Sequence, residues 1–245
     1  MQNKLTVEGA TILLTGAGGG IGTATARALA SAGAKLILAD FRDVSALADE
    51  LREQGAEVES YVCDVTDRPA VERLCDEIGP RLQAAILNAG SNPFNDWMSE
   101  DFDKAFADLM AVNVIGPINF ARALIPHMQS NRYGRIVVLG SVAGFNGGSI
   151  AAVPPDYVIS KGGVHTMVRW LAKVAGEFVT VNAVAPGVVD TAMTAGSTFT
   201  PPAHQPIKRK ATPEEIAWPI AFLCSPGASY ITGAVIDING GLVFR

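Results

Sequence analysis

Tyr157 and Lys161 are four residues apart, a spacing that could place a phenol beside an ammonium group. On a helix, residues i and i+4 share one face. A free phenol has a pKa near 10, too high for a general base at neutral pH. A cation about 4 Å away, at an effective dielectric of about 20, would favour the phenolate by about 4 kcal/mol, on the order of three pKa units. The pair therefore predicts a tyrosine that exchanges a proton near neutral pH, although the same spacing also arises by chance in many helices.

A glycine-rich segment, TGAGGGIG at residues 15–22, follows the first apolar run of the chain. Glycines let the backbone turn tightly and approach a ligand closely. The N-terminus of a following helix offers free N–H groups to a phosphate. The spacing is that of Gly16, Gly20 and Gly22 rather than Gly-x-Gly-x-x-Gly. Between a strand and a helix, this segment predicts dinucleotide binding rather than a merely structural turn.

Asp40 ends the second apolar run, eighteen residues after Gly22. A carboxylate at this place can accept hydrogen bonds from the ribose hydroxyls of adenosine, and it repels a 2′-phosphate. Arg42 follows two residues later, and an arginine there could accommodate a 2′-phosphate. We therefore expect NAD as the cofactor, with NADP as the less favoured alternative.

The composition is that of a globular protein without a polyanionic partner. The chain has 245 residues, of which 49% are apolar and 18% are charged, and its net charge is −5. These values argue against a nucleic-acid or anionic-membrane surface. The three cysteines are scattered and the three histidines are isolated, so we expect no disulfide framework and no metal site. Residues 1–6 lack the apolar core of a signal peptide, and we expect a soluble, cytoplasmic protein.

Short apolar runs alternate with helix-forming segments from end to end. Strands are predicted at residues 10–15, 35–40, 58–63, 84–87, 135–139, 179–184 and 235–238. Helices are predicted at residues 21–32, 44–54, 68–78, 100–129 and 156–175, and from Pro213 with Thr212 as its N-cap. The alternation predicts an α/β fold with a seven-stranded, doubly wound parallel sheet and helices on both faces. We expect a single domain over residues 1–245, with a cofactor half at about 8–115 and a substrate half at about 116–245.

The predicted helix at residues 156–175 is apolar nearly all round, which is typical of a helix buried on two sides. One side can face the sheet. The other needs either a neighbouring helix of the same chain or a second subunit. We favour the second subunit and expect a homo-oligomer, with a homotetramer as the expected state.

Taken together, these motifs resemble those of the short-chain dehydrogenase/reductase family over residues 8–241. Further segments match the family's pattern at residues 63–65, 87–90, 112–114, 140–144 and 182–187. The chain departs from that pattern at Leu87, where the family has asparagine, and at Gly140, where it often has serine. The resemblance implies a single-domain Rossmann fold.

The resemblance also implies a catalytic tetrad of Asn113, Ser141, Tyr157 and Lys161. Tyr157 would be the general base in alcohol oxidation and the general acid in ketone reduction. Lys161 would lower the pKa of the tyrosine, helped by the positive ring of NAD⁺, and would bind the nicotinamide ribose. Ser141 would hold the substrate oxygen, and Asn113 would connect Lys161 to solvent through water.

The glycine segment, the Asp40 region and the matched motifs together define an expected cofactor site. Its residues are Gly16, Gly18, Gly20, Ile21, Gly22, Asp40, Phe41, Arg42, Asp64, Val65, Asn88, Ala89, Gly90, Tyr157, Lys161, Pro186, Gly187, Val189 and Thr191.

Substrate is expected at the carboxyl ends of the strands, between loops 91–98, 142–155 and 188–210. These loops carry mostly apolar side chains. Residues 194–204 are typical of a mobile lid, and residues 208–210 (Lys-Arg-Lys) could either grip an acidic substrate tail or form a solvated face. The residues expected to contact substrate are Ser141, Phe94, Phe145, Val153 and Met193, with Trp97, Met98, Ile150 and Phe199 nearby.

The function predicted from the sequence is an NAD-dependent oxidoreductase that interconverts a secondary alcohol and a ketone by hydride transfer. One alternative is an NADPH-dependent 3-oxoacyl-thioester reductase. Alternatives of another kind are a non-catalytic dinucleotide-binding sensor, and an isomerase on the same scaffold. The partner is a small-molecule substrate, and no nucleic acid or membrane partner is expected.

Overall fold

The computed structural model describes residues 5–148, 153–195 and 199–245, and these form one sheet of seven parallel strands. The strand order is β3-β2-β1-β4-β5-β6-β7, so the chain reverses its direction of progress between β1 and β4. The strands are β1 (Thr11–Thr15), β2 (Lys35–Asp40), β3 (Val58–Val62), β4 (Ala84–Leu87), β5 (Gly134–Leu139), β6 (Val179–Pro186) and β7 (Val235–Ile238). The predicted doubly wound parallel fold is confirmed.

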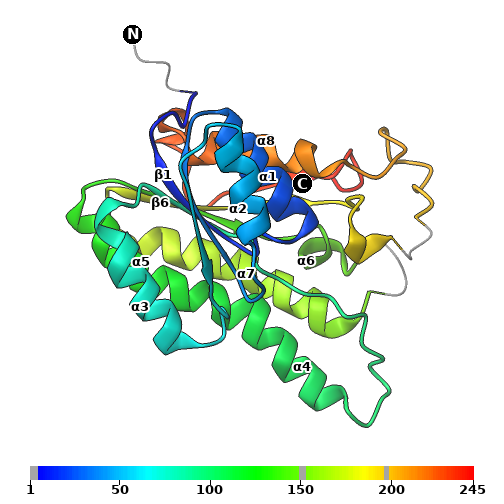
Figure 1. The fold of residues 1–245 in the computed structure, drawn as a ribbon. Helices are drawn as coiled ribbons and strands as arrows, with labels where there is room; N and C mark the ends of the chain where they lie inside the picture. Colours follow the sequence, from blue (N-terminus) through cyan, green and yellow to red (C-terminus); the bar gives the residue numbers. More distant parts are fainter. Residues whose placement is uncertain (1–4, 149–152, 196–198) are drawn as a thin grey trace.

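Helices cover both faces of this sheet (Figure 1). One face carries α1 (Gly20–Ser31), α2 (Ser45–Glu53) and α8 (Pro213–Cys224), and the other carries α3 (Arg68–Ile78), α5 (Gly116–Ser130) and α7 (Pro155–Val174). The remaining helical elements are α4 (Phe102–Met110), α6 (Ala143–Asn146), η1 (Gly79–Arg81), η2 (Ala111–Ile115), η3 (Ala192–Thr194) and η4 (Pro226–Ala228). As predicted, α8 begins at Pro213, and the carboxylate of Glu215 accepts the N–H of Thr212 at 2.8 Å.

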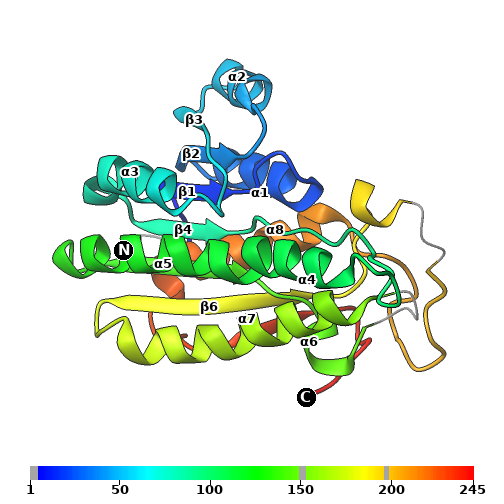
Figure 2. The ribbon, with the colours of Figure 1, turned by 90° about the horizontal axis from the view of Figure 1, so that it is seen from below.

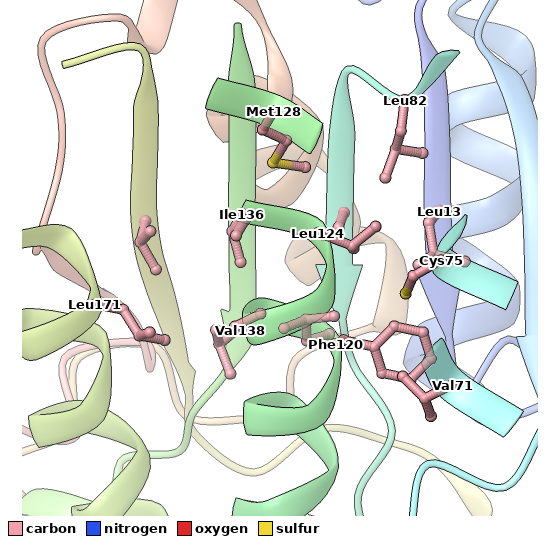
Figure 3. Packing of buried hydrophobic residues seen from close by; sticks show 14 of the residues in the cluster. Leu13, Val71, Cys75, Leu82, Phe120, Leu124, Met128, Ile136, Val138 and Leu171 are labelled. Atoms are coloured by element: carbon pink, nitrogen blue, oxygen red, sulfur yellow. The ribbon is translucent and has the colours of Figure 1, made fainter. Parts of the chain in front are cut away.

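The core has two apolar layers, one on each side of the sheet. Successive residues of a strand point to opposite faces, so Ile12 and Leu14 join the layer under α1 and α8, while Leu13 joins the other. Figure 3 shows this second layer, in which Phe120 and Leu124 of α5 pack against the sheet. Burial on both faces explains why the strands are almost continuously apolar.

The segment predicted as one helix at residues 100–129 is divided by a π-helical turn. The turn, η2, covers Ala111–Ile115 and joins α4 to α5. The whole stretch Phe102–Ser130 is long and apolar enough to cross a membrane by length and composition alone, a test that core helices also pass. Its inner face here belongs to the core, since Phe120, Leu124 and Met128 are fully buried.

Helix α7 is only partly covered by its own chain. Val164, Val168 and Leu171 belong to the core. On the outer face, Ile159, Trp170 and Val174 remain 51%, 60% and 48% exposed. The neighbouring elements therefore leave an apolar stripe on this helix, as the sequence pattern indicates.

Candidate active site

A cavity of about 720 Å³ opens at the carboxyl ends of the strands. The register brings three strand ends to one level, because Thr15 is paired with Ala39 of β2 and with Leu87 of β4. The residues that follow these positions are Gly16, Asp40 and Asn88, and all three line the cavity. The cavity thus lies where the strand order reverses, the usual place for a ligand in an open parallel sheet. The long segments after β4 and β6 lie at this end of the molecule (Figure 2).

The glycine segment packs too closely for side chains at three positions. Gly16 has a φ of +65°, and a Cβ there would lie 2.7 Å from the Cα of Ala89. A Cβ on Gly20 would lie 2.7 Å from Cγ2 of Thr191, and one on Gly22 would overlap the carbonyl oxygen of Gly16. Helix α1 begins at Gly20 with no acidic residue in its first turn. Its positive end therefore faces the cavity with no acidic side chain of its own, which suits a phosphate group.

Thr15 and Asn88 lock the ends of β1 and β4 together. The hydroxyl oxygen of Thr15 accepts the N–H groups of Asn88 and Ala89 at 3.1 and 3.2 Å. The amide nitrogen of Asn88 donates to the carbonyl oxygens of Thr15 and Gly16 at 3.1 and 2.9 Å. Among the described residues, Oδ1 of Asn88 is buried without a hydrogen-bond partner. An unpaired acceptor at the cavity wall is what a polar ligand with a free donor would satisfy.

Asp40 is 4% exposed and holds the glycine segment against β2. Its Oδ2 accepts the N–H of Gly18 at 3.0 Å, and its Oδ1 accepts the N–H of Arg42 at 3.1 Å. The guanidinium of Arg42 lies beside the same carboxylate, with Nε 3.6 Å from Oδ1. A carboxylate that could bind a ribose and a cation that could bind a 2′-phosphate are therefore neighbours here, and the geometry accommodates both alternatives for the cofactor.

The residues present fit a nicotinamide dinucleotide. Every residue expected at the cofactor site lines this one cavity. The N-terminus of α1 there suits a phosphate, and the carboxylate of Asp40 suits a ribose. That these residues bind the cofactor stays a prediction. Several residues that were not predicted for the cofactor site also line the cavity: Gly19, Cys63, Thr66, Ser91, Asp108, Ala111, Val112, Leu139, Gly140, Ala192 and Thr194. Most of them directly adjoin predicted residues, and that adjacency was the available signal.

Ser141, Tyr157 and Lys161 line the same cavity. Burial raises the pKa of Tyr157, and a hydrogen bond with the Ser141 side chain opposes this rise with a smaller effect. Burial also lowers the pKa of Lys161 to about 8. Its Nζ donates to the carbonyl oxygen of Leu139 at 2.8 Å and lies 5.7 Å from the centroid of the tyrosine ring.

The expected lowering of the Tyr157 pKa by Lys161 is therefore not found, and that expectation needs correction. It assumed an ammonium about 4 Å away in a moderately polar medium. Burial instead disfavours the charged forms of both groups, and the ammonium is directed at a backbone carbonyl. At neutral pH the phenol keeps its proton.

Asn113 lies in the π-helical turn and links it to the loop after β4. Its Oδ1 accepts the N–H of Ser91 at 2.8 Å, and its Nδ2 donates to the carbonyl oxygen of Ser91 at 3.0 Å and to Oγ of Ser160 at 3.1 Å. A Cβ on Gly90 would lie 3.3 Å from Oδ1 of Asn113 and 3.5 Å from Nζ of Lys161. Asn113 therefore lies close to α7, although it does not line the cavity itself.

The five residues expected to contact substrate are not gathered together. Ser141 and Met193 line the cavity, whereas Phe94, Phe145 and Val153, all described, do not. Phe94 has a φ of +56° in the loop after β4, and Phe145 stacks on a histidine of α7. Val153 lies against Gly148, where a Cβ would be 2.9 Å from that of the valine.

The remaining loop residues have varied positions. Trp97 and Met98 are exposed, and Ile150 falls outside the described residues, as do residues 196–198 of the expected lid. In the basic triplet at residues 208–210, Arg209 pairs with Glu215 at 2.7 Å and Lys210 donates to the carbonyl oxygen of Thr194 at 2.9 Å.

Known proteins resemble this chain over nearly its whole length. Residues 16–243 match the family model described as enoyl-(acyl carrier protein) reductase. The galactitol 2-dehydrogenase (L-tagatose-forming) of Cereibacter sphaeroides is 40% identical over 247 residues, covering 96% of this chain and 95% of that protein. The chain belongs to the short-chain dehydrogenase/reductase family.

Other members of the short-chain dehydrogenase/reductase family differ in substrate and cofactor. A 3-oxoacyl-acyl-carrier-protein reductase of Thermotoga maritima is 35% identical over 250 residues, covering 97% of this chain and 99% of that protein. The solved 7α-hydroxysteroid dehydrogenase complexed with NADH has a TM-score of 0.88 at 29% identity, covering 98% of each chain. The NADPH-dependent 3-quinuclidinone reductase of Rhodotorula rubra has a TM-score of 0.91 at 26% identity, covering 99% of this chain and 94% of that one. This chain is accordingly a nicotinamide-dependent oxidoreductase by family.

His165 lies behind this site, one turn after Lys161 on α7, and is 1% exposed. Burial, followed by the charges of Lys161, Arg169 and Arg245, lowers the pKa of its imidazole to about 4. Because this value is below the ordinary value of 6.5, the unfolded chain binds the proton more readily between about pH 4 and about pH 6.5. The protein must therefore lose stability as the pH falls through that window.

We predict that the wild-type protein loses about 2 kcal/mol more of its unfolding free energy between about pH 7.5 and about pH 5 than the His165→Gln variant does. Glutamine does not titrate, so the difference isolates the imidazole. Chemical denaturation at the two pH values measures it. Equal losses in the two proteins would show that the histidine is not held neutral by the fold.

Proposed function

We propose that this protein is an NAD-dependent oxidoreductase that interconverts a secondary alcohol and a ketone, with Tyr157 as the general acid and base. The observation that carries the proposal is that Ser141, Tyr157 and Lys161 line the same cavity as the glycine segment and Asp40. The hydrogen bond between Ser141 and Tyr157 supports it further, since both hydroxyls can then approach one substrate oxygen.

The chain's own residues supply binding, orientation and proton transfer. A bound dinucleotide supplies the hydride acceptor or donor. The first turn of α1 would hold its phosphates, Asp40 its adenosine ribose, and Val189 with Thr191 its carboxamide. Ser141 holds the substrate oxygen by a hydrogen bond.

Tyr157 then moves the proton. In reduction its phenol donates to the substrate oxygen, and in oxidation the phenolate receives the hydroxyl proton. Because burial raises the pKa of Tyr157, the phenol is protonated at neutral pH and is ready to act as an acid. Lys161, which titrates near its lowered pKa of about 8, is the neighbouring group that exchanges protons most readily.

The main alternative is an NADPH-dependent 3-oxoacyl-thioester reductase. It is supported by the Thermotoga relative and by Arg42, whose guanidinium lies beside Asp40. A non-catalytic dinucleotide sensor is less favoured, because the serine, tyrosine and lysine all line the cavity. The free, buried cysteines at 63, 75 and 224 support a reducing, cytoplasmic location.

We predict that Tyr157→Phe lowers kcat by about 10²- to 10⁴-fold, because the variant keeps the ring but has no proton to transfer. A screen of secondary alcohols, hydroxy acids, sugars and steroids, followed by NAD⁺ reduction, finds the substrate and measures the loss. Cofactor titration serves as the control, and Kd should change far less than kcat, because the rest of the cofactor site is kept. Full activity in the variant would refute the role of Tyr157.

We predict that the wild-type protein prefers NAD⁺ over NADP⁺ in kcat/KM, and that Asp40→Asn shifts the ratio toward NADP⁺ by about tenfold or more. Asparagine keeps an acceptor for the N–H of Gly18 but removes the charge that repels a 2′-phosphate. Arg42→Ala is the matched variant and should shift the ratio the other way. A wild-type preference for NADP⁺ would instead favour the thioester-reductase alternative.

We further propose that a second copy of the chain covers the apolar stripe of Ile159, Trp170 and Val174 on α7, within a homotetramer. The stripe belongs to the helix that carries Tyr157 and Lys161, so its coverage would hold both residues rigid. Light scattering should give about four times the 25.6 kDa mass of one chain, and Trp170→Glu should reduce it. A wild-type protein that is monomeric at micromolar concentration would exclude this assembly.

A further inference from the structure

His165 makes a contact with the catalytic segment that the mechanism above does not use. Its Nε2 accepts the backbone N–H of Ser141 at 3.4 Å, and its ring is fully enclosed. The ring lies between the glycines on either side of that serine. A Cβ on Gly140 would lie 2.5 Å from its Nε2, and one on Gly144 would lie 2.7 Å from its Cε1.

The close approach gives a physical reason for glycine at position 140, where the chain departs from the family's usual serine. A side chain there would collide with the imidazole or push the serine segment outward. Gly140 and His165 therefore fit each other, because the imidazole occupies the space that a side chain at position 140 would need.

The imidazole is clamped from its far side by a stack of two further groups. The ring of Phe145 stacks on His165, with centroids 4.1 Å apart and planes at 26°. The guanidinium carbon of Arg245 lies 3.5 Å from the centroid of Phe145. Arg245 is itself anchored, because Nε bonds to the carboxylate of Asp237 at 2.9 Å and an NH₂ group donates to the carbonyl oxygen of Val235 at 2.8 Å. Figure 2 shows this end of the chain beside α6, which carries Phe145.

Charge around the ring keeps its acceptor nitrogen available. Lys161 lies one turn before His165, Arg169 lies one turn after it, and Arg245 lies beyond Phe145, so protonation of the imidazole is opposed from three sides. Among the described residues, the groups that shift its pKa are Lys161, Arg169 and Arg245, and none of them is a carboxylate. A neutral ring that accepts at Nε2 carries its proton on Nδ1, and among the described residues this Nδ1 has no hydrogen-bond partner.

The hydroxyl of Ser141 is held from a separate direction. Its Oγ accepts the N–H of Ala143 at 3.1 Å, and it also bonds to Tyr157. The backbone of the serine is thus fixed by His165, and its side chain by the first turn of α6.

We propose that His165 is a positioning residue for Ser141, and that the Phe145–Arg245 stack holds it in place. The neutral ring accepts the serine N–H and sets the distance of the serine hydroxyl from Tyr157. The expected effect on turnover rests on the proposed function, whereas the contact and the tautomer do not. The ring does not line the cavity, so it acts through the serine and not on substrate or cofactor.

The first arm of the test reads the geometry without any substrate. Nitrogen-15 spectra of the histidine side chains should show His165 as the neutral tautomer protonated at Nδ1 at pH 7. The chain has only three histidines, so His165→Gln assigns the signal. A ring protonated at Nε2, or a charged ring, would overturn the proposal.

The second arm reads the consequence for turnover. His165→Leu fills the space without an acceptor and should lower kcat by about tenfold or more, while the cofactor Kd, measured by nicotinamide fluorescence, stays unchanged. His165→Gln offers a carbonyl acceptor and should recover most of kcat, and Arg245→Met should cause a smaller loss. His127→Gln, on α5, is the matched control and should change neither readout.

Equal kcat losses in the leucine and glutamine variants, with equal melting temperatures, would show that the ring is only a packing element and would overturn the proposal. Unchanged kcat in the leucine variant would do the same. If the leucine variant does not fold, the tautomer and the comparison of His165→Gln with wild type decide the question. If wild type turns over no alcohol at all, the proposed function fails, while the tautomer still tests the contact.

Discussion

The hydroxyl of Thr15 and the amide of Asn88 form the junction on which the site depends. β1 and β4 are paired as far as Thr15 and Leu87, but the segments that follow them lead to helices on opposite faces of the sheet. Here five side-chain hydrogen bonds join the two strand ends: the threonine hydroxyl accepts two and donates one, and the asparagine amide donates two. The glycine segment starts from this junction, and the loop that carries Ser91 toward Asn113 leaves it in the opposite direction.

Burial is the second constraint on the site, because it disfavours the charged forms of the titratable side chains. Tyr157 and Lys161 both shift toward their neutral forms, and so does His165 behind them. Three titratable groups on consecutive turns of α7 thus share one tendency, imposed first by burial, and the charge of Lys161 adds to the effect on His165.

Much of this molecule could be predicted from periodicity and from residues with narrow conformational roles. Strands such as Lys35–Asp40 and Val235–Ile238 have the predicted bounds, because short apolar runs between helix signals have one stable arrangement in an α/β protein. The convergence of Gly16, Asp40 and Asn88 follows from parallel register, which needs only the strand ends. Effects that depend on surroundings were not accessible. Estimating the pKa of Tyr157 required its burial, and placing Phe145 away from the cavity required the position of His165.

The π-helical turn allows one continuous helical segment both to pack in the core and to position Asn113. A π turn holds one residue more than an α turn, which rotates everything after it by about 100° relative to an unbroken α-helix. Without that change of phase, a face that directs Phe120 and Leu124 into the core could not also direct Asn113 at Ser160. The additional residue of the π turn thus gives Asn113 a different direction from that of Phe120 and Leu124. Loss of the one additional residue would therefore move either the core side chains or Asn113 away from their present contacts.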